Sequence, residues 1–365
     1  MKIVIVRPVI SQVRALMTQE KDTIAIPIWE INQDPSLSEK DILANQDINW
    51  ISWHPPKYKL ISFINKILFF KKIIDSYEVK ILHLNGLRDT IQVYFARIIS
   101  NQKPKIILTS RNSYLWFNPK KNRLIGLFLN KFSDGYVALS SKNKNQLIEL
   151  GFPEKKICFI PNAFNHFEFS INNDNSTVHK NKVRIIYVAS VIRNKSQTTL
   201  IESVHNINNQ NFELLLIGST EQDPDYHLEL KNKIVNLELE NVVKILGKLS
   251  HNEVIKYYIS SDIVVFPSIS EMMPRAVIEA MWFGKPVIAS AIDGILDLIK
   301  DKETGLLCNP ADKDDFSKAI LFLIENPNEG VRIGKAGQKY VQEFCSLEVV
   351  GKKYLEFYEQ ILNSY

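Results

Sequence analysis

Short β-rich apolar runs alternate with longer amphipathic segments along the whole chain. This alternation predicts βα units around parallel sheets, because strands buried on both faces read as continuous apolar runs. We expect strands in two series, one in each half of the chain. They lie at residues 2–6, 24–28, 79–84, 105–109, 136–139 and 157–160, and at 184–189, 213–218, 242–246, 263–267, 286–290 and 305–308.

A polar stretch over residues 169–182 separates the two series and shows no periodicity, as expected of a linker or an exposed loop. We therefore predict one Rossmann-like domain over residues 1–168 and a second over 183–345. The final segment, 346–365, has a helix pattern, and we expect it to cross back to the first domain. The predicted fold class is α/β, with two doubly wound domains facing each other across a ligand-binding cleft.

Composition agrees with a folded protein of two domains. The 365 residues are 45% hydrophobic and 23% charged, which excludes wholesale disorder. The three cysteines, Cys158, Cys308 and Cys345, lie far apart and show no zinc-binding spacing. No apolar run has the roughly 18 to 20 residues of a membrane span, and the start of the sequence does not have the pattern of a signal peptide. We therefore expect a cytoplasmic protein.

The charge is uneven. Residues 1–170 hold 24 Lys and Arg against 14 Asp and Glu, a balance of +10, while residues 171–365 hold 21 against 26, a balance of −5. A basic first half indicates an anionic partner such as a membrane, a nucleic acid or a phosphorylated acceptor, unless its lysines only cover a solvated face.

The densest chemical signal is a strand, loop and helix over residues 261–290. Pro274 suits the first helical position, and Glu279 is the one acid in an otherwise apolar helix. A buried carboxylate needs partners. Glu279 either accepts hydrogen bonds from a vicinal diol such as ribose, or only pairs with Arg275 one turn earlier.

The loop before this helix favours the diol. The amides of Met272, Met273 and the first helical turn offer a seat for phosphate, and Glu271 beside them can accept hydrogen bonds from sugar hydroxyls. Glu279 as a diol acceptor, the amides as a phosphate-binding site and Glu271 as a hydroxyl acceptor match, in this order, the ribose, the diphosphate and the sugar of a nucleotide sugar.

Glu271 and Glu279 resemble the E-x7-E motif of retaining GT-B glycosyltransferases, in particular glycosyltransferase family 4 (glycosyl transferases group 1). Other stretches resemble the family in the family's order, over roughly residues 134–325. They are 160–165 (IPNAFN), 188–195, 200–203, 216–218, 245–247, 280–289, 293–299 and 305–310.

The resemblance implies roles for single residues. Glu279 would hold the ribose, Glu271 the transferred sugar, and Lys195 the diphosphate of the donor. The backbone at Leu246 and Gly247 would meet the base. No cofactor and no metal are expected, since no Asp-x-Asp pair is spaced for a cation beside a strand end.

The sequence departs from the family at several sites. Ser190 replaces an arginine that normally helps to hold the diphosphate; Arg193 or Arg275 could replace it. Asp293 replaces the first glycine of a Gly-Gly pair. His83 and Arg111 are the candidates on the acceptor side, although a histidine on a strand is more often structural than catalytic.

Two basic apolar segments, 57–72 and 114–132, predict amphipathic helices. We expect their apolar faces to pack on the first sheet and their lysines to contact an anionic membrane. In the first segment those lysines are Lys57, Lys59, Lys66, Lys71 and Lys72.

The sequence thus predicts a retaining glycosyltransferase that uses a nucleotide sugar to extend a saccharide or lipid-linked acceptor in surface polysaccharide or glycolipid synthesis. It would be cytoplasmic or peripheral on the inner face of the membrane, without a nucleic-acid partner. The alternatives are a soluble synthase of a disaccharide or sugar phosphate, and a pseudoenzyme that binds sugar nucleotides.

Overall fold

The computed structural model describes residues 1–6, 10–19, 23–26, 59–87, 89–109, 119–164, 182–207 and 211–364. It divides into two compact units, one formed by Met1–Asn165 with Ser346–Tyr365 and the other by His166–Cys345. From the sequence we placed the corresponding boundaries at residues 168, 182 and 345. Residues 169–181 of the predicted linker lie outside the described part of the chain.

The first unit is built on a parallel sheet with the strand order β2-β1-β3-β4-β5-β6. The chain leaves β1 toward one edge and returns to continue at β3, so the order reverses between these two strands. The strands are β1 (Ile3–Val6), β2 (Thr23–Ile26), β3 (Ile81–Asn85), β4 (Lys105–Thr109), β5 (Gly135–Ala138) and β6 (Ile157–Phe159).

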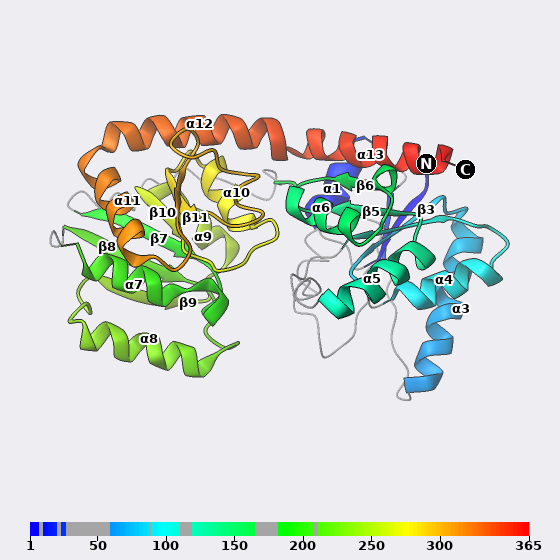
Figure 1. Cartoon of the computed structure of the whole chain (residues 1–365), viewed down its shortest axis with the longest axis horizontal. Helices are drawn as coiled ribbons and strands as arrows, with labels where there is room; N and C mark the ends of the chain where they lie inside the picture. The colour runs from blue at the N-terminus through cyan, green and yellow to red at the C-terminus, as the bar shows by residue number, and fades with distance from the viewer. Residues whose placement is uncertain are drawn as a thin grey trace. The chain divides into compact units, whose positions relative to one another are not determined.

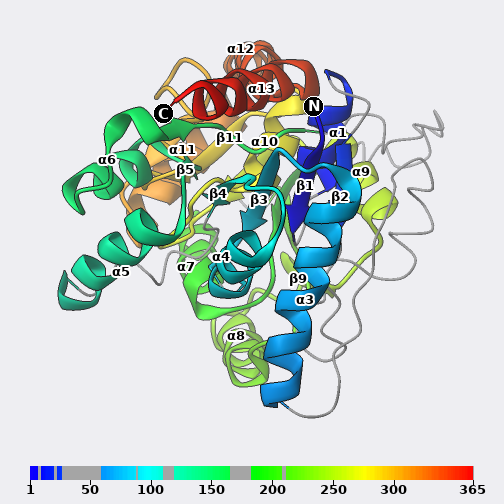
Figure 2. The same cartoon turned by 90° about the vertical axis from the view of Figure 1, so that its right-hand side faces the viewer.

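Helices cover both faces of this sheet (Figures 1 and 2). One core joins the sheet to α1 (Ile10–Met17) and α13 (Leu347–Asn363). The other core joins the opposite face to four helices, which therefore form one layer. These are α3 (Lys59–Tyr77), α4 (Thr90–Ile99), α5 (Pro119–Phe132) and α6 (Ser141–Glu149).

The C-terminal helix α13 belongs to the first unit and packs closely on α1. At Gly351 an added Cβ would lie only 1.9 Å from the carbonyl oxygen of Ala15, so glycine is required for this approach. Ser346 caps the helix through the amide of Val349. The last helix therefore completes a core whose other members lie more than 180 positions earlier in the chain.

The second unit repeats the architecture with the strand order β12-β11-β10-β7-β8-β9, again all parallel. Its strands are β7 (Val183–Val188), β8 (Phe212–Ile217), β9 (Val243–Gly247), β10 (Ile263–Phe266), β11 (Val287–Ser290) and β12 (Leu306–Cys308). Its helices are α7 (Gln197–His205), α8 (Pro224–Asn236), α9 (His251–Ser260), α10 (Arg275–Trp282), α11 (Lys313–Glu325) and α12 (Pro327–Cys345). The prediction of two doubly wound α/β units is confirmed.

The orientation of α3 differs from the expectation. Of the apolar residues in the predicted segment 57–72, Ile67 packs on the core as expected, whereas Phe63, Ile64 and Leu68 are exposed, and Phe70, Ile73 and Ile74 occupy the core. Both faces of this helix are apolar, so periodicity alone could not select the buried one.

Two of the predicted membrane-facing lysines on α3 are used inside the unit. Lys66 is buried and its Nζ lies 2.5 Å from Asp89 Oδ1, while Lys71 pairs with Asp75 at 2.5 Å. Lys72 is exposed, and Lys57 lies outside the described residues. Among the described helices, none has the length and apolarity needed to cross a bilayer.

Candidate active site

The candidate site lies where the strand order of the second sheet reverses, between β7 and β10. Ligands of open parallel sheets bind at the carboxyl ends of the strands at such a point. The loops that follow the two strands are joined there: the amide of Ile269 donates to the carbonyl of Asn194 at 3.0 Å, and Asn194 Nδ2 donates to Ser270 O at 3.2 Å. Strand order thus unites two segments that are 76 positions apart.

An ion pair between Lys195 and Glu271 occupies the centre of these loops. Lys195 Nζ lies 2.5 Å from Glu271 Oε1, with side chains 21% and 14% exposed. Ser268 Oγ donates to the same carboxylate oxygen at 2.9 Å. Within the described part of the chain, Oε2 of Glu271 and two of the three protons of Lys195 have no partner. The pair can therefore accept hydrogen bonds from hydroxyl groups and donate to an anion.

Tyr187, which was not among the predicted site residues, links the two loops through its hydroxyl. Its buried hydroxyl donates to the carbonyl of Lys195 at 2.8 Å and lies 3.1 Å from Ser268 Oγ. Burial raises the pKa of Tyr187 well above its usual value, so the hydroxyl remains a proton donor. The signal was present in the sequence, because a tyrosine inside an apolar strand needs a partner for its hydroxyl.

Two glycines let backbones meet closely at this edge of the sheet. A Cβ on Gly218 would lie 1.9 Å from the carbonyl oxygen of Ala189, and one on Gly294 would lie 2.0 Å from that of Met272. Gly294 has a φ of +75°, which L-residues rarely adopt. Of the family's Gly-Gly pair, this chain therefore keeps Gly294, the glycine that the packing requires, and has Asp293 at the other position.

Helix α10 begins at Arg275, one residue later than predicted, and Pro274 is its N-cap. Met273 is buried and Met272 half-buried, so the loop between the two glutamates is part of the packed unit. The amides of the first turn have no acceptor within the helix, which leaves them for a ligand or solvent.

Glu279 is buried on α10, and no ion pair joins it to Arg275, although both residues are described. The expectation that Glu279 only pairs with Arg275 is therefore not met. Tyr258 lies beside this carboxylate and donates its hydroxyl to the carbonyl of Ala276 at 3.1 Å. Burial, and then the charge of Glu279, raise the pKa of Tyr258 well above its usual value.

The predicted base-binding segment ends β9. The carbonyl of Gly247 accepts a hydrogen bond from the amide of Gly218 at 2.9 Å, which aligns the ends of β8 and β9. The side chain of Leu246 lines a separate hollow of about 410 Å³ with Arg184, Glu213 and residues of α9. The backbone of Gly247, and not the side chain of Leu246, thus lies at the carboxyl edge.

The two arginines that could replace the one missing at Ser190 lie in different surroundings. Arg193 turns to α8, where it pairs with Glu229 at 2.8 Å and lies over the ring of Tyr226 at 5.1 Å. Arg275 is exposed, and Ser190 accepts a hydrogen bond on its carbonyl from Gln197. Lys195 is therefore the cation that the described structure places against Glu271.

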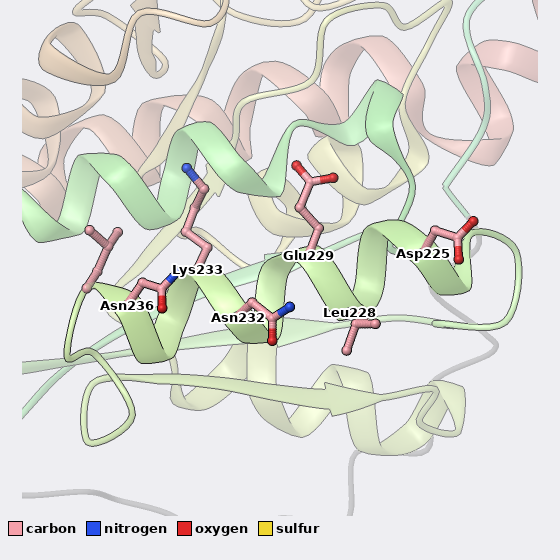
Figure 3. Close-up of a pocket in the computed structure, with 7 residues that line it drawn as sticks. Asp225, Leu228, Glu229, Asn232, Lys233 and Asn236 are labelled. Atoms are coloured by element: carbon pink, nitrogen blue, oxygen red, sulfur yellow. The ribbon is translucent and has the colours of Figure 1, made fainter.

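A shallow hollow of about 510 Å³ follows α8 and contains none of the predicted site residues (Figure 3). In Figure 3, Glu229 and Lys233 point toward the neighbouring helix, and Leu228 points away from it. Lys233 pairs there with Glu202 of α7. The described residues form no group of three or more His, Cys, Asp or Glu side chains that could hold a metal ion.

On the acceptor side, His83 is fully buried in β3 and both of its ring nitrogens are engaged. Nδ1 lies 2.5 Å from the hydroxyl of Tyr358, and Nε2 lies 2.8 Å from Thr109 Oγ1. This favours the structural role for His83, as a tie between β3 and α13. Arg111 lies outside the described residues.

Comparison with known proteins identifies the class. The model of the glycosyl transferases group 1 matches residues 169–340, and that of glycosyltransferase family 4 matches residues 33–166. The two models match the two halves of the chain, which therefore belongs to glycosyltransferase family 4 (glycosyl transferases group 1) of the GT-B glycosyltransferases.

Particular relatives agree with this class. An uncharacterized glycosyltransferase of Methanocaldococcus jannaschii is 26% identical over 298 residues, which cover 80% of this chain and 79% of that protein. The N,N'-diacetylbacillosaminyl-diphospho-undecaprenol alpha-1,3-N-acetylgalactosaminyltransferase of Campylobacter jejuni is 22% identical over 64% of this chain; the match spans 62% of its own length. The crystal structure of HepE from Anabaena with UDP and glucose has a TM-score of 0.81, with 19% identity and 98% of each chain covered.

Proposed function

We propose that this glycosyltransferase moves a sugar from a nucleoside diphosphate sugar to a saccharide or lipid-linked acceptor, with retention of anomeric configuration. The observation that carries the proposal is the Lys195–Glu271 pair at the reversal of strand order. A free carboxylate oxygen and free ammonium protons next to each other match a sugar hydroxyl next to a diphosphate.

Charge explains the role of each partner. The bond to the departing diphosphate breaks more easily when a cation stabilises the negative charge that develops on it. Lys195 supplies that cation, and Ser268 and Tyr187 hold it and Glu271 in place. The Oε2 atom of Glu271 accepts hydrogen bonds from hydroxyl groups of the transferred sugar and so holds the sugar in place.

The rest of the donor follows the edge of the sheet. The amides at Met272, Met273 and the start of α10 face the diphosphate, and Glu279 holds the ribose hydroxyls. The base meets the backbone at Gly247. HepE, whose fold this chain shares, was crystallised with UDP, so UDP sugars are the first donors to examine.

The acceptor class is supported by the name of the Campylobacter relative, which describes transfer to a saccharide on diphospho-undecaprenol. An acceptor of this kind places the enzyme at the cytoplasmic face of a membrane, in the synthesis of a surface polysaccharide or glycolipid. A soluble sugar or sugar phosphate as acceptor, or donor binding without transfer, would indicate the two alternatives stated above.

A panel of UDP, GDP and ADP sugars, with release of nucleoside diphosphate as the readout, tests the proposal. Glu271→Gln and Glu279→Gln should each lower kcat/KM at least a hundredfold, about 3 kcal/mol, while the fold is kept. Glu202→Gln is the matched control, because Glu202 also pairs with a lysine of the same unit, away from the site. Near-normal turnover in both site variants would show that the assignment is wrong.

The same assay addresses the two remaining features of the proposal. Transfer should continue in EDTA, since Lys195 and the amides face the diphosphate; activity that disappears and returns only with Mg²⁺ or Mn²⁺ contradicts this. The anomeric configuration of the first product, read by NMR, decides between retention and inversion.

A further inference from the structure

The hollow of about 410 Å³ between helix α9 and the edge of the second sheet, which we call the α9 hollow, has no role in the proposed transfer. Its described lining includes neither Lys195 nor Glu271. The volume is in the range of about 300–1,000 Å³ that is usual for small-molecule sites. Five of the nine residues that line it are charged, although the layer between a helix and a sheet is normally apolar.

Three strands contribute to the sheet side of the α9 hollow. Arg184 on β7 is in register with Glu213 on β8, and Leu215 on β8 is in register with Lys244 on β9. Residues in register, or two positions apart on one strand, point to the same face of a sheet. The four residues therefore form one largely polar row, which ends at β9, the last strand in the order.

Helix α9 faces this row with a polar stripe of its own. The stripe consists of lining residues that are three or four positions apart along the helix, namely Glu253, Lys256, Tyr257 and Ser260. The buried residues of α9 occupy other positions of the helix. The contacts that hold α9 in place are thus separate from the side chains that line the hollow.

A buried ion pair lines the α9 hollow and is incompletely satisfied. The Arg184 side chain is 4% exposed; its Nε donates to Glu213 Oε1 at 2.7 Å, and its Nη1 donates to Ser260 Oγ at 2.9 Å. Within the described part of the chain, Nη2 of Arg184 and Oε2 of Glu213 have no hydrogen-bond partner, and neither atom is enclosed. A charged donor therefore remains available to a ligand, in the class of hydrogen bond that is strongest.

An aromatic ring gives the α9 hollow a flat wall. The half-buried ring of Tyr257 has its centroid 6.0 Å from Cζ of Arg184. Leu215 and Leu246 add apolar surface to the same lining. A flat ring in a ligand would cover these side chains, whereas a bare inorganic anion would leave them in contact with water.

The charges of the lining favour an anion. Three cations against two acids leave a balance of +1. Arg184 offsets Glu213, and Glu253 accepts hydrogen bonds from the amide and hydroxyl of its helix's N-cap residue at 2.8 and 2.6 Å. Lys244 and Lys256 are exposed and form no ion pair among the described residues.

We propose that the α9 hollow binds a small organic anion with a flat ring. Its phosphate or carboxylate group is held by Arg184 and by the two exposed lysines, and its ring lies against Tyr257. This inference goes beyond the proposed function and does not depend on it, because binding is measured without a sugar donor or an acceptor.

Isothermal titration calorimetry on the full chain tests it with three probes, 2-naphthoate, AMP and inorganic phosphate. At least one of the two ring-bearing probes should bind one to one, and about tenfold or more tightly than inorganic phosphate. Binding of 2-naphthoate assigns the anionic group as a carboxylate, and binding of AMP assigns it as a phosphate.

Three variants should weaken the probe that binds. Lys244→Gln with Lys256→Gln should lose about tenfold or more in affinity, because the ligand's charge loses two partners. Tyr257→Leu keeps apolar volume but removes the flat ring, and it should weaken binding by several-fold. Arg184→Lys keeps the charge and removes the free Nη2 donor, so it should also weaken binding.

Two controls separate the α9 hollow from other cations. Lys335→Gln with Lys339→Gln removes two exposed lysines of α12 in the same unit and should bind as the unmodified chain does. Lys195→Met should also leave binding unchanged, because Lys195 does not line the hollow. If circular dichroism shows that Arg184→Lys is unfolded, the double lysine variant and Tyr257→Leu still supply the comparison.

Four results would overturn the proposal. They are no binding of either ring-bearing probe, binding no tighter than that of inorganic phosphate, equal losses in the double lysine variant and its α12 control, and a loss in Lys195→Met that the double lysine variant does not share. The last result would place the probe at the Lys195–Glu271 pair instead.

Discussion

The two units share an architecture and differ in where their charges lie. Helices α3, α4 and α5 of the first unit hold nine basic residues and one acid, while the six helices of the second unit hold nine basic residues and ten acids. The exposed large apolar residues of the second unit are spread over several elements. Three of the nine cations, Lys66, Lys71 and Arg97, are paired with aspartates, so the two units differ in the net charge of these helices and in where their exposed apolar residues gather.

Their buried polar groups differ as well. In the first unit both ring nitrogens of His83 are engaged, one with Tyr358 and the other with Thr109. The contact with Tyr358 links α13 to the sheet. In the second unit the network around Glu271 leaves one carboxylate oxygen and part of an ammonium group without a partner in the described chain. A saturated network stabilises, whereas an unsaturated one at a strand reversal can bind a ligand.

The largest effect that separates the units is on activity. Lys195→Met should lower kcat/KM at least a hundredfold, because the departing diphosphate loses its cation, while thermal stability changes little. Lys233→Met is the control, since it also removes a lysine paired with a glutamate in the second unit, and it should retain activity. Equal activity of the two variants would show that the Lys195–Glu271 pair matters no more for transfer than the Lys233–Glu202 pair.

The next effect is on the stability of the second unit. Gly218→Ala should destabilise it by roughly 3 kcal/mol, because the new methyl group meets the carbonyl of Ala189. Gly247→Ala has open space, so only its positive φ opposes alanine, at about 1 kcal/mol. Hydrogen exchange resolved by peptide should show the loss in the second unit alone. Similar losses in both variants would contradict the tight approach at Gly218.

The sequence predicted the sheets well and the contacts between loops poorly. Every strand in the described part of the chain was predicted, because apolar runs between polar turns carry that signal locally. The pairing of Lys195 with Glu271 depends on β10 lying beside β7, which no local pattern contains. The resemblance to a known family brought both residues to the site, but not Tyr187 or Ser268, which hold them there.

The outward face of α3 shows a different limit. Both sides of the helix are apolar, so the choice between them is made by the sheet and by the pairing of buried Lys66 with Asp89. Lys66 was predicted to face a membrane together with the other lysines of the basic segment 57–72. The buried pair reverses that expectation and turns Ile64 and Leu68 outward.

A smaller effect tests the saturated network of the first unit. Tyr358→Phe removes the hydroxyl beside His83 Nδ1 and should cost about 1–2 kcal/mol of stability, with faster hydrogen exchange in β3 and α13. Tyr340→Phe is the matched change in the second unit, where a half-buried hydroxyl donates to Asp297 O at 3.0 Å. It should cost less. An effect of Tyr358→Phe on the second unit would contradict the assignment of α13 to the first.

The smallest effect concerns alkaline pH and the second unit. Burial, and then nearby aspartates, raise the pKa of the Cys308 thiol from 9.0 to about 12. The folded state therefore keeps this proton while the unfolded state releases it, so stability is constant below about pH 9 and falls as pH rises toward 12. At pH 10 this loss is about 1.4 kcal/mol, one pH unit above the unfolded pKa. Cys308→Ala should unfold in denaturant with a shallower decline between pH 8 and 10, and parallel declines in the two proteins would show that this thiol is not held protonated by the fold.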